Sequence, residues 1–524
     1  MIVIISYFTS IHVAFWYQNV NLSKEVPYFH ISLVIIMIMN TIRCFCLGLV
    51  IISFGYTASA QFENVMTTNE VYVDYIESIQ FGHSQIPLSM PIIDLGSQGE
   101  LKLEFDDLDG GFKNYTYHLI HCDKDWYFSD LEEIEYLDGF NGEEIDEFTY
   151  SANAYSEYTN YQVFLPNEDL NWTISGNYLL VIYDDDLQIP VLTRRFIVSE
   201  NVVSALADFV RPKEISYIRT HQELEVSLNM RDFQVFRPQQ EIFVTVMQNG
   251  NFSNAFSNVT SNFSRGDILF FNDFNQQVAF PALKEFRSVD IRSLNFRSEF
   301  VKTIDRNEEG TTVLLDLGRQ RSQDNYRNER DANGGFVIEN FDLNRDRFFQ
   351  ANQISGENGT PVPNQQLSNE IFDSDRNRFF DSASGSRSSR VSERARLRDQ
   401  GLSADNITSE YADVIFSLEV DNPYLEDVYV VGGFSDWKAR EKFRMQWDAD
   451  NQIYLCKAPL KQGYYDYMFA VQNENGYLSI EDIEGSWFET ENVYQIITYY
   501  REMGAEFDRV IDVAILTTNP NGLR

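Results

Sequence analysis

The chain has 524 residues and is strongly acidic, because 79 Asp and Glu stand against 41 Lys and Arg, for a formal net charge of −38 at pH 7. This balance argues against binding to nucleic acid, which needs a basic face, and against general adhesion to anionic lipid. Hydrophobic residues make up 44% and aromatic residues 15%, so most of the chain can build cores rich in strands. The length predicts roughly three domains.

A secretory leader is predicted some distance from residue 1. Arg43 precedes an apolar run at 44–56, and the small tripeptide Ala-Ser-Ala ends at Ala60. This order is typical of a signal peptide over 37–60, with Gln61 as the first residue after cleavage. The alternative is a membrane anchor, which is disfavoured because no basic stop-transfer flank follows the run.

A signal peptide normally begins close to the start of translation, so the 36 residues that precede Met37 are unexpected. We expect translation to begin at Met37 or Met39, so that 1–36 is a mis-called upstream extension. The competing interpretation is a genuine first hydrophobic helix.

Two of the four cysteines lie in the predicted leader, which leaves Cys122 and Cys456. Two cysteines so far apart do not form a disulfide framework. We expect both to be buried free thiols.

The segment 61–199 is expected to form an N-terminal β-sandwich. Residues 101–105 alternate apolar and charged side chains, as in a half-buried strand, whereas 178–183 are continuously apolar, as in a strand buried on both faces. Short turns such as 109–111 separate these segments. Many strands with short turns predict antiparallel pairing and a boundary near residue 200.

Three further segments follow from composition and pattern. Strand patterns predict a second β-sandwich at 200–338 and an early-set-like one at 410–524. Between them, 339–409 is rich in Asn, Asp, Ser and Arg and lacks alternating apolar runs, which predicts a long low-complexity, disordered insertion. The expected fold class is therefore all-β, with tandem immunoglobulin-like or early-set β-sandwich domains.

The densest group of ligand-type residues lies at the end of the strand predicted at 115–122. His118 and His121 point to opposite faces of a strand, which argues against a shared zinc ion with Cys122 or Asp123. We expect a structural strand end followed by a turn, with Trp126 packed in the core. No serine-hydrolase elbow and no phosphate loop occur, so we expect no catalytic residues, metal or cofactor, and no enzyme.

The sequence Val-Tyr-Val-Val-Gly-Gly-Phe-Ser-Asp-Trp at 428–437 resembles a strand of early-set, glycogen-binding-type sandwiches. In carbohydrate-binding members an exposed Trp stacks on sugar, so Trp437 is a candidate for glycan stacking. The other interpretation is that Trp437 packs at the end of its strand. The alternative function is thus a carbohydrate-binding envelope protein.

Several blocks taken together resemble the type IX secretion system plug protein family. They are 117–126, 135–140, 175–180, 192–196, 220–223, 248–250, 284–287, 460–465 and 490–494. The residues of these blocks that we single out as structural motif residues are His121, Cys122, Asp123, Asp125, Trp126, Gly176, Arg194, Arg195, His221, Gly463 and Tyr464. The segments 1–36 and 339–409 depart from the expected family pattern.

This resemblance implies a non-enzymatic periplasmic protein that is peripherally associated with the outer membrane. Its implied partner is the outer-membrane translocon barrel of the SprA/Sov type, whose periplasmic opening it would close. Neither nucleic acid nor an obligate membrane span of the mature chain is implied, and a glycan remains the alternative ligand.

Overall fold

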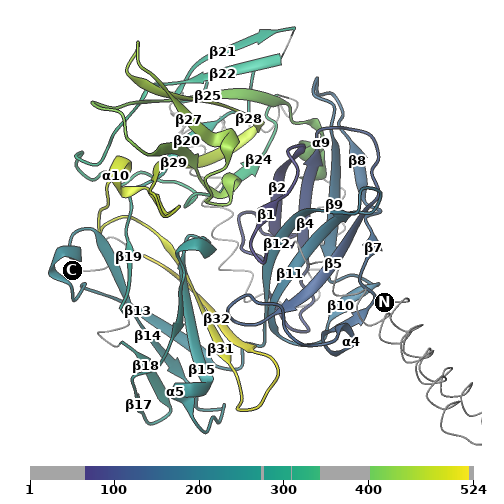
Figure 1. The fold of residues 1–524 in the computed structure, drawn as a ribbon, viewed down its shortest axis with the longest axis vertical. Coiled ribbons are helices and arrows are strands. Elements are labelled where there is room, and N and C mark those ends of the chain that lie inside the picture. The colour runs from purple at the N-terminus through teal and green to yellow at the C-terminus, as the bar shows by residue number, and fades with distance from the viewer. Residues whose placement is uncertain (1–64, 273–276, 309, 343–401, 519–524) are drawn as a thin grey trace, which may run out of the picture. The chain divides into compact units, whose positions relative to one another are not determined.

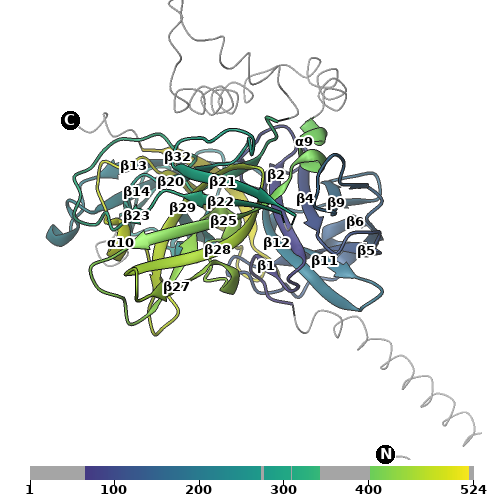
Figure 2. The same ribbon diagram turned by 90° about the horizontal axis from the view of Figure 1, so that it is seen from above.

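The computed structural model describes residues 65–272, 277–308, 310–342 and 402–518 (Figures 1 and 2). Over these ranges the fold consists mainly of antiparallel sheets, which confirms the all-β prediction. No helix in the described ranges has the length and apolar character needed to cross a membrane. The predictions for 1–36, 37–60, Ala60 and Gln61 lie outside the described residues, as does most of the predicted insertion.

The first core lies between two sheets built from residues 70–199. Their strand orders are β1-β12-β11-β5-β7, with β3 beside β12, and β2-β4-β9-β8, while β6 pairs with β10. The strands are β1 (Glu70–Val71), β2 (Ile76–His83), β3 (Ile92–Asp94), β4 (Leu101–Asp107), β5 (Tyr115–Cys122), β6 (Leu137–Gly139), β7 (Glu143–Glu144), β8 (Phe148–Tyr150), β9 (Thr159–Leu165), β10 (Leu170–Trp172), β11 (Gly176–Asp184) and β12 (Ile189–Ser199). Every residue of β11 is buried, as its apolar run predicts, because β11 pairs with both β5 and β12.

The second core lies between the sheets β13-β14-β18-β17, with β19 beside β14, and β16-β15-β31-β32. The strands are β13 (Ser204–Val210), β14 (His221–Asn229), β15 (Ile242–Gln248), β16 (Phe256–Val259), β17 (Phe263–Arg265), β18 (Ile268–Phe271), β19 (Val278–Pro281), β31 (Val493–Tyr500) and β32 (Arg509–Thr517). The turn after β15 contains Asn249 and Gly250, both with positive φ, as the Asn-Gly pair predicts.

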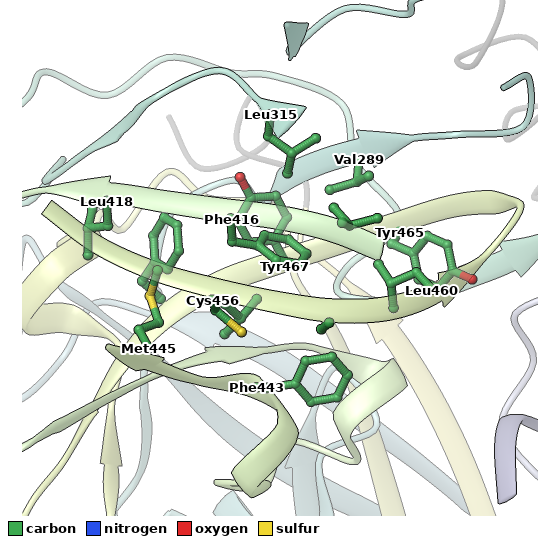
Figure 3. Packing of buried hydrophobic residues seen from close by; sticks show 14 of the residues in the cluster. Val289, Leu315, Phe416, Leu418, Phe443, Met445, Cys456, Leu460, Tyr465 and Tyr467 are labelled. Atoms are coloured by element: carbon green, nitrogen blue, oxygen red, sulfur yellow. The ribbon is translucent and has the colours of Figure 1, made fainter. Parts of the chain in front are cut away.

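The third core is built around a long sheet with the order β20-β29-β26-β27-β28-β25-β22-β21. Short strands β23, β24 and β30 pair with β25 or β29. The strands are β20 (Arg287–Asp290), β21 (Val301–Asn307), β22 (Gly310–Leu315), β23 (Gly318–Arg319), β24 (Phe336–Ile338), β25 (Tyr411–Glu419), β26 (Asp427–Val431), β27 (Arg444–Asp448), β28 (Ile453–Lys461), β29 (Gly463–Gln472) and β30 (Leu478–Ser479). Figure 3 shows Phe416, Cys456 and Tyr467 packed together in this core.

Short helical segments join these strands. They are α4 (Glu133–Tyr136), α5 (Pro238–Glu241), α9 (Leu402–Thr408), α10 (Glu481–Glu484) and the 3₁₀ turns η1 (Ile215–Tyr217), η2 (Phe252–Asn254), η4 (Gly433–Ser435) and η5 (Glu441–Phe443).

The sheets do not follow the expected domain limits of 200–338 and 410–524. Strand β15 pairs with β31, from Ile242 opposite Tyr500 to Gln248 opposite Tyr494, so the chain returns to the second core after building the third. In the same way β20 pairs with β29 of the third core. Local alternation marks a strand but not its partner, which is why the sequence pattern placed these strands in continuous domains.

The described ends of the segment 339–409 are folded, so the expected insertion limits are too wide. The side-chain amide of Asn340 donates to the carbonyl of Thr408 at 2.7 Å. Helix α9 also receives a backbone hydrogen bond from Ala152 of the first sandwich at the Ile407 carbonyl, at 2.8 Å. The first contact joins the two ends of the segment to each other, and the second ties α9 to the first sandwich.

Candidate functional site

The motif residue His121 is enclosed at the end of β5. Its side chain is buried, and Nδ1 lies 3.0 Å from the Ser129 hydroxyl. Gly176 lies against the ring with φ +154°, and a Cβ at this position would stand 2.2 Å from Nε2, so only glycine leaves room for the imidazole. Burial lowers the pKa of His121 to about 4, so the ring is neutral at neutral pH. This environment supports a packing role.

Asp123 shapes the turn that follows β5. One carboxylate oxygen accepts the backbone N–H groups of Asp125 and Tyr127, each at 2.9 Å. The carbonyl of Asp123 accepts the Asn177 amide at 2.9 Å, which fixes the turn against β11. Trp126 adopts φ +67° within this turn. A side chain that bonds its own following backbone is a common way to stabilise such a conformation.

The same turn joins the first sandwich to the second core. The carboxylate of Asp125 accepts the Asn258 amide at 2.6 Å and pairs with Lys124 at 2.5 Å. The backbone N–H of Lys124 donates to Asp508 at 3.0 Å. Asn258 belongs to β16, and Asp508 immediately precedes β32. The motif turn is therefore a junction between two cores.

Trp126 is the apolar part of this junction. It is buried, as the sequence predicts, and meets Phe252 edge to face with ring centroids 5.5 Å apart. The Arg195 guanidinium lies 4.3 Å from the indole centroid and donates to the Thr67 carbonyl at 2.5 Å. Burial lowers the pKa of Arg195 to about 10, which still leaves the group charged at neutral pH. Cation–π contacts of this kind contribute more when they are shielded from water.

Arg194 points toward the third core. It donates to the Thr193 carbonyl at 2.7 Å, and it pairs with Asp436 at 3.4 Å. Asp436 follows strand β26 directly after the turn η4. The two consecutive arginines of β12 thus serve two different junctions.

Besides the Arg194–Asp436 pair, three lysines of the third core form ion pairs with acids of the first sandwich, and we call these three pairs the inner edge. Lys438 pairs with Glu70, and Lys442 pairs with Glu77, at 2.5 and 2.6 Å. The third pair joins Lys461 to Asp106 at 2.5 Å, with side chains 1% and 0% exposed.

The Lys461–Asp106 pair is supported by neutral donors. Tyr411 donates its hydroxyl to Asp106 at 2.6 Å, and the Asn160 amide donates to the other oxygen at 2.9 Å. Burial raises the pKa of Asp106 and lowers the pKa of Lys461, and the attraction between the two charges opposes both shifts. A buried pair of this kind depends on such additional hydrogen bonds.

Lys461 lies in the block 460–465 that resembles the family, but no local pattern distinguishes this residue. The alternation at 101–105 predicts a half-buried strand, although Asp106 and Glu104 are buried too. The face beneath Asp106 is covered by a segment more than 300 residues later in the chain, and no local pattern carries that information.

The remaining motif residues lie apart from this junction. His221 stacks on Tyr217 with ring centroids 3.9 Å apart, and burial lowers its pKa. Gly463 faces β24, where a Cβ would stand 2.3 Å from the Val337 carbonyl oxygen. Tyr464 is buried beside it, and burial raises its pKa well above the usual value. Their assigned roles as motif residues stay predictions.

Trp437 packs within the fold in the described structure. Its indole meets Phe286 edge to face at 5.7 Å and lies against Gly334, where a Cβ would be 2.4 Å from the ring. It is partly buried against a small cluster that includes Tyr429 and Met468. This placement agrees with packing at the strand end, and glycan stacking by Trp437 stays a prediction.

The two cysteines that follow the predicted leader are enclosed within the fold. Cys122 and Cys456 are both buried free thiols, as expected. Burial raises the pKa of each to about 12, which keeps the thiol protonated and unreactive.

The first sandwich matches a known family model, which is described as the first domain of the type 9 secretion system plug protein and covers residues 76–200. The predicted resemblance is confirmed there. A similar solved structure is the crystal structure of a hypothetical protein from Parabacteroides merdae, with 25% sequence identity and a TM-score of 0.71. The similarity covers 87% of this chain and 100% of that one. Among curated proteins, none matches the chain.

Proposed function

We propose that this protein is a non-enzymatic periplasmic plug. It binds the periplasmic side of the type IX secretion translocon barrel in the outer membrane and closes the opening when no substrate occupies it. The observation that carries this proposal is the match of residues 76–200 to the plug-protein first domain.

The junctions between the cores support this function. A plug that resists flow through a wide aqueous opening needs rigid bulk rather than a reactive pocket. The buried pair of Lys461 and Asp106 and the packing of Trp126 on Phe252 hold separate sandwiches together. Such contacts limit the motion of one sandwich against another, which is otherwise common between domains.

The charge of the chain suits reversible docking. A net charge of −38 keeps the free protein soluble and makes its association with a basic surface fast and sensitive to salt. A contact that must open during secretion is better served by such a polar interface than by a large obligate one.

A deletion strain tests the proposal. Loss of this protein is expected to leave secretion largely intact while the outer membrane becomes permeable to antibiotics that it normally excludes. Antibiotic uptake and co-purification of the barrel with the tagged wild-type chain are the measurements, and re-expression of the wild-type chain is the control. Unchanged permeability together with a barrel that never carries this chain would refute the plug. Retention of the chain on α-glucan would then favour the glycan alternative.

A further inference from the structure

The first sandwich carries a long segment without any basic residue. No Lys, Arg or His occurs between Lys124 and Arg194, while this stretch holds sixteen Asp and Glu residues. Nine of them lie between Asp130 and Glu147. The acids of this stretch are therefore not balanced by any basic residue nearby in the sequence.

Large apolar side chains stand among these acids. Ile134 is 87% exposed, Phe140 is 79% exposed and Tyr127 is 71% exposed. We call the exposed side chains of residues 127–148 the outer face. Isolated exposed apolar residues are ordinary, whereas large apolar side chains that are exposed together and bordered by polar residues mark interaction surfaces.

The backbone beneath the outer face is held firmly. Tyr136 and Ile145 are buried in the first core. The side-chain amide of Asn141 exchanges two hydrogen bonds with the backbone of Leu119, at 2.8 and 3.0 Å. Gly139 passes so close to β10 that a Cβ would stand 2.0 Å from the Asp169 carbonyl oxygen. Since this surface is already ordered, a partner would bind it with little loss of conformational entropy.

The outer face lies on the side of the first sandwich opposite the inner edge. Strands β7 and β8 end their sheets on one side, whereas β1 and β2 end them on the other. In Figure 1, α4 and β7 lie on the side of the first sandwich away from the other two cores, whereas β8 lies near α9. In the described part of the chain, no three His, Cys, Asp or Glu side chains are grouped to hold a metal ion. The acids of the outer face therefore present a diffuse negative surface to solvent.

We propose that the outer face is the surface through which this protein docks on its partner, and that the complementary surface is basic and contains apolar pockets for Ile134 and Phe140. This inference rests on the proposed function, because we assign the basic surface to the periplasmic rim of the translocon barrel. Charge complementarity selects the partner surface and speeds encounter, and the two apolar side chains provide the anchors that slow dissociation.

Binding to the purified, detergent-solubilised translocon barrel tests the assignment. The full chain is compared with the double variant Ile134→Ser, Phe140→Ser and with the triple variant Asp138→Lys, Glu144→Lys, Asp146→Lys. Matched controls are Leu425→Ser and Glu474→Lys, which alter exposed residues of the third core. Thermal unfolding of every variant verifies the fold, since all these side chains point to solvent.

Both outer-face variants are expected to raise Kd at least tenfold, while the controls stay within twofold of the wild type. Raising salt from about 50 to 300 mM should weaken wild-type binding and should affect the triple variant much less. Equal binding by the wild type and both variants overturns this inference and leaves the proposed function standing. If the wild type itself does not bind the barrel, the proposed function fails and this assignment fails with it.

Discussion

The inner edge and the outer face of the first sandwich are both acidic, but only the acids of the inner edge are paired with lysines of the third core. At the inner edge each of Glu70, Glu77 and Asp106 faces a lysine of the third core within 2.6 Å. At the outer face, residues 127–148 include no basic side chain, and acids such as Asp138, Glu144 and Asp146 are exposed.

The difference follows from the cost of burial. A carboxylate that loses water requires an opposite charge and hydrogen bonds, which is why lysines of the third core face the acids of the inner edge. A carboxylate in water requires no such partner. The unmatched charge can therefore remain where no other part of the described chain covers the sandwich, and there it is available to an external partner.

Removing the buried lysine should break the inner edge most severely. Lys461→Met leaves Asp106 buried without its cation, and we expect a loss of about 3–5 kcal/mol in the free energy of unfolding. Urea denaturation followed by circular dichroism measures this loss. The control Lys457→Met removes an exposed pair with Asp413 and should cost no more than about 1 kcal/mol. The double variant Lys461→Met, Asp106→Asn should recover part of the stability. A Lys461→Met protein as stable as the wild type would contradict this account.

The buried carboxylate of Glu484, which is paired with two arginines of the third core, should make the stability of the fold depend on pH in a defined direction. Burial acts to raise the pKa of Glu484, but Arg287 and Arg321 lower it to about 2. Because this value lies below the ordinary 4.5, the carboxylate stabilises the fold fully above pH 4.5, and the contribution disappears as the pH falls toward 2. Glu484→Gln should therefore cost about 3 kcal/mol at pH 7.

Urea midpoints measured between pH 7 and pH 3 test this pH dependence. The difference in urea midpoint between the wild type and Glu484→Gln should be constant above about pH 5 and should become smaller below pH 4.5. A difference in urea midpoint that grows as the pH falls would contradict the lowered pKa of Glu484.

Removing the partly exposed Lys442–Glu77 pair of the inner edge should lower the stability by a smaller amount. The Lys442 and Glu77 side chains are 28% and 11% exposed, so water screens their attraction. We expect Lys442→Met to cost about 1 kcal/mol, measured by the same denaturation. A loss as large as that of Lys461→Met would show that exposure does not distinguish the two pairs.

The smallest effect on stability is expected at the outer face. The triple variant Asp138→Lys, Glu144→Lys, Asp146→Lys should change the free energy of unfolding by no more than about 0.5 kcal/mol, because these side chains are exposed. Thermal unfolding at low and high salt measures the change. A large loss would mean that these acids have structural partners.

Local sequence pattern was sufficient for many elements of the fold. The strand at 115–122 was predicted with its observed limits, and Trp126 was placed correctly in a buried position after it. The continuous apolar run at 178–183 correctly indicated a strand buried on both faces. These features depend on neighbouring residues, so alternation and turn chemistry reveal them.

Long-range pairing was not predictable in the same way. The pairing of β15 with β31 joins segments about 250 residues apart, and Asp106 meets Lys461 across 355 positions. Neither the alternation in β15 nor the charge of Lys461 specifies its partner. The motif turn was recognised as structural, but its contact with Asn258 and Asp508 follows only from the fold.

The return of the chain to the second core has a consequence for the order in which the protein can fold. When the chain is delivered from its N-terminus, β15 emerges long before β31, and one edge of β15 has no partner until residues 493–500 arrive. During that interval an apolar strand with an unpaired edge is open to association with other chains. The first and third core clusters contain no residue of β31 or β32, so they can form earlier. We therefore expect the second core to be completed last, and a chaperone that holds unfolded chains to act mainly on this step.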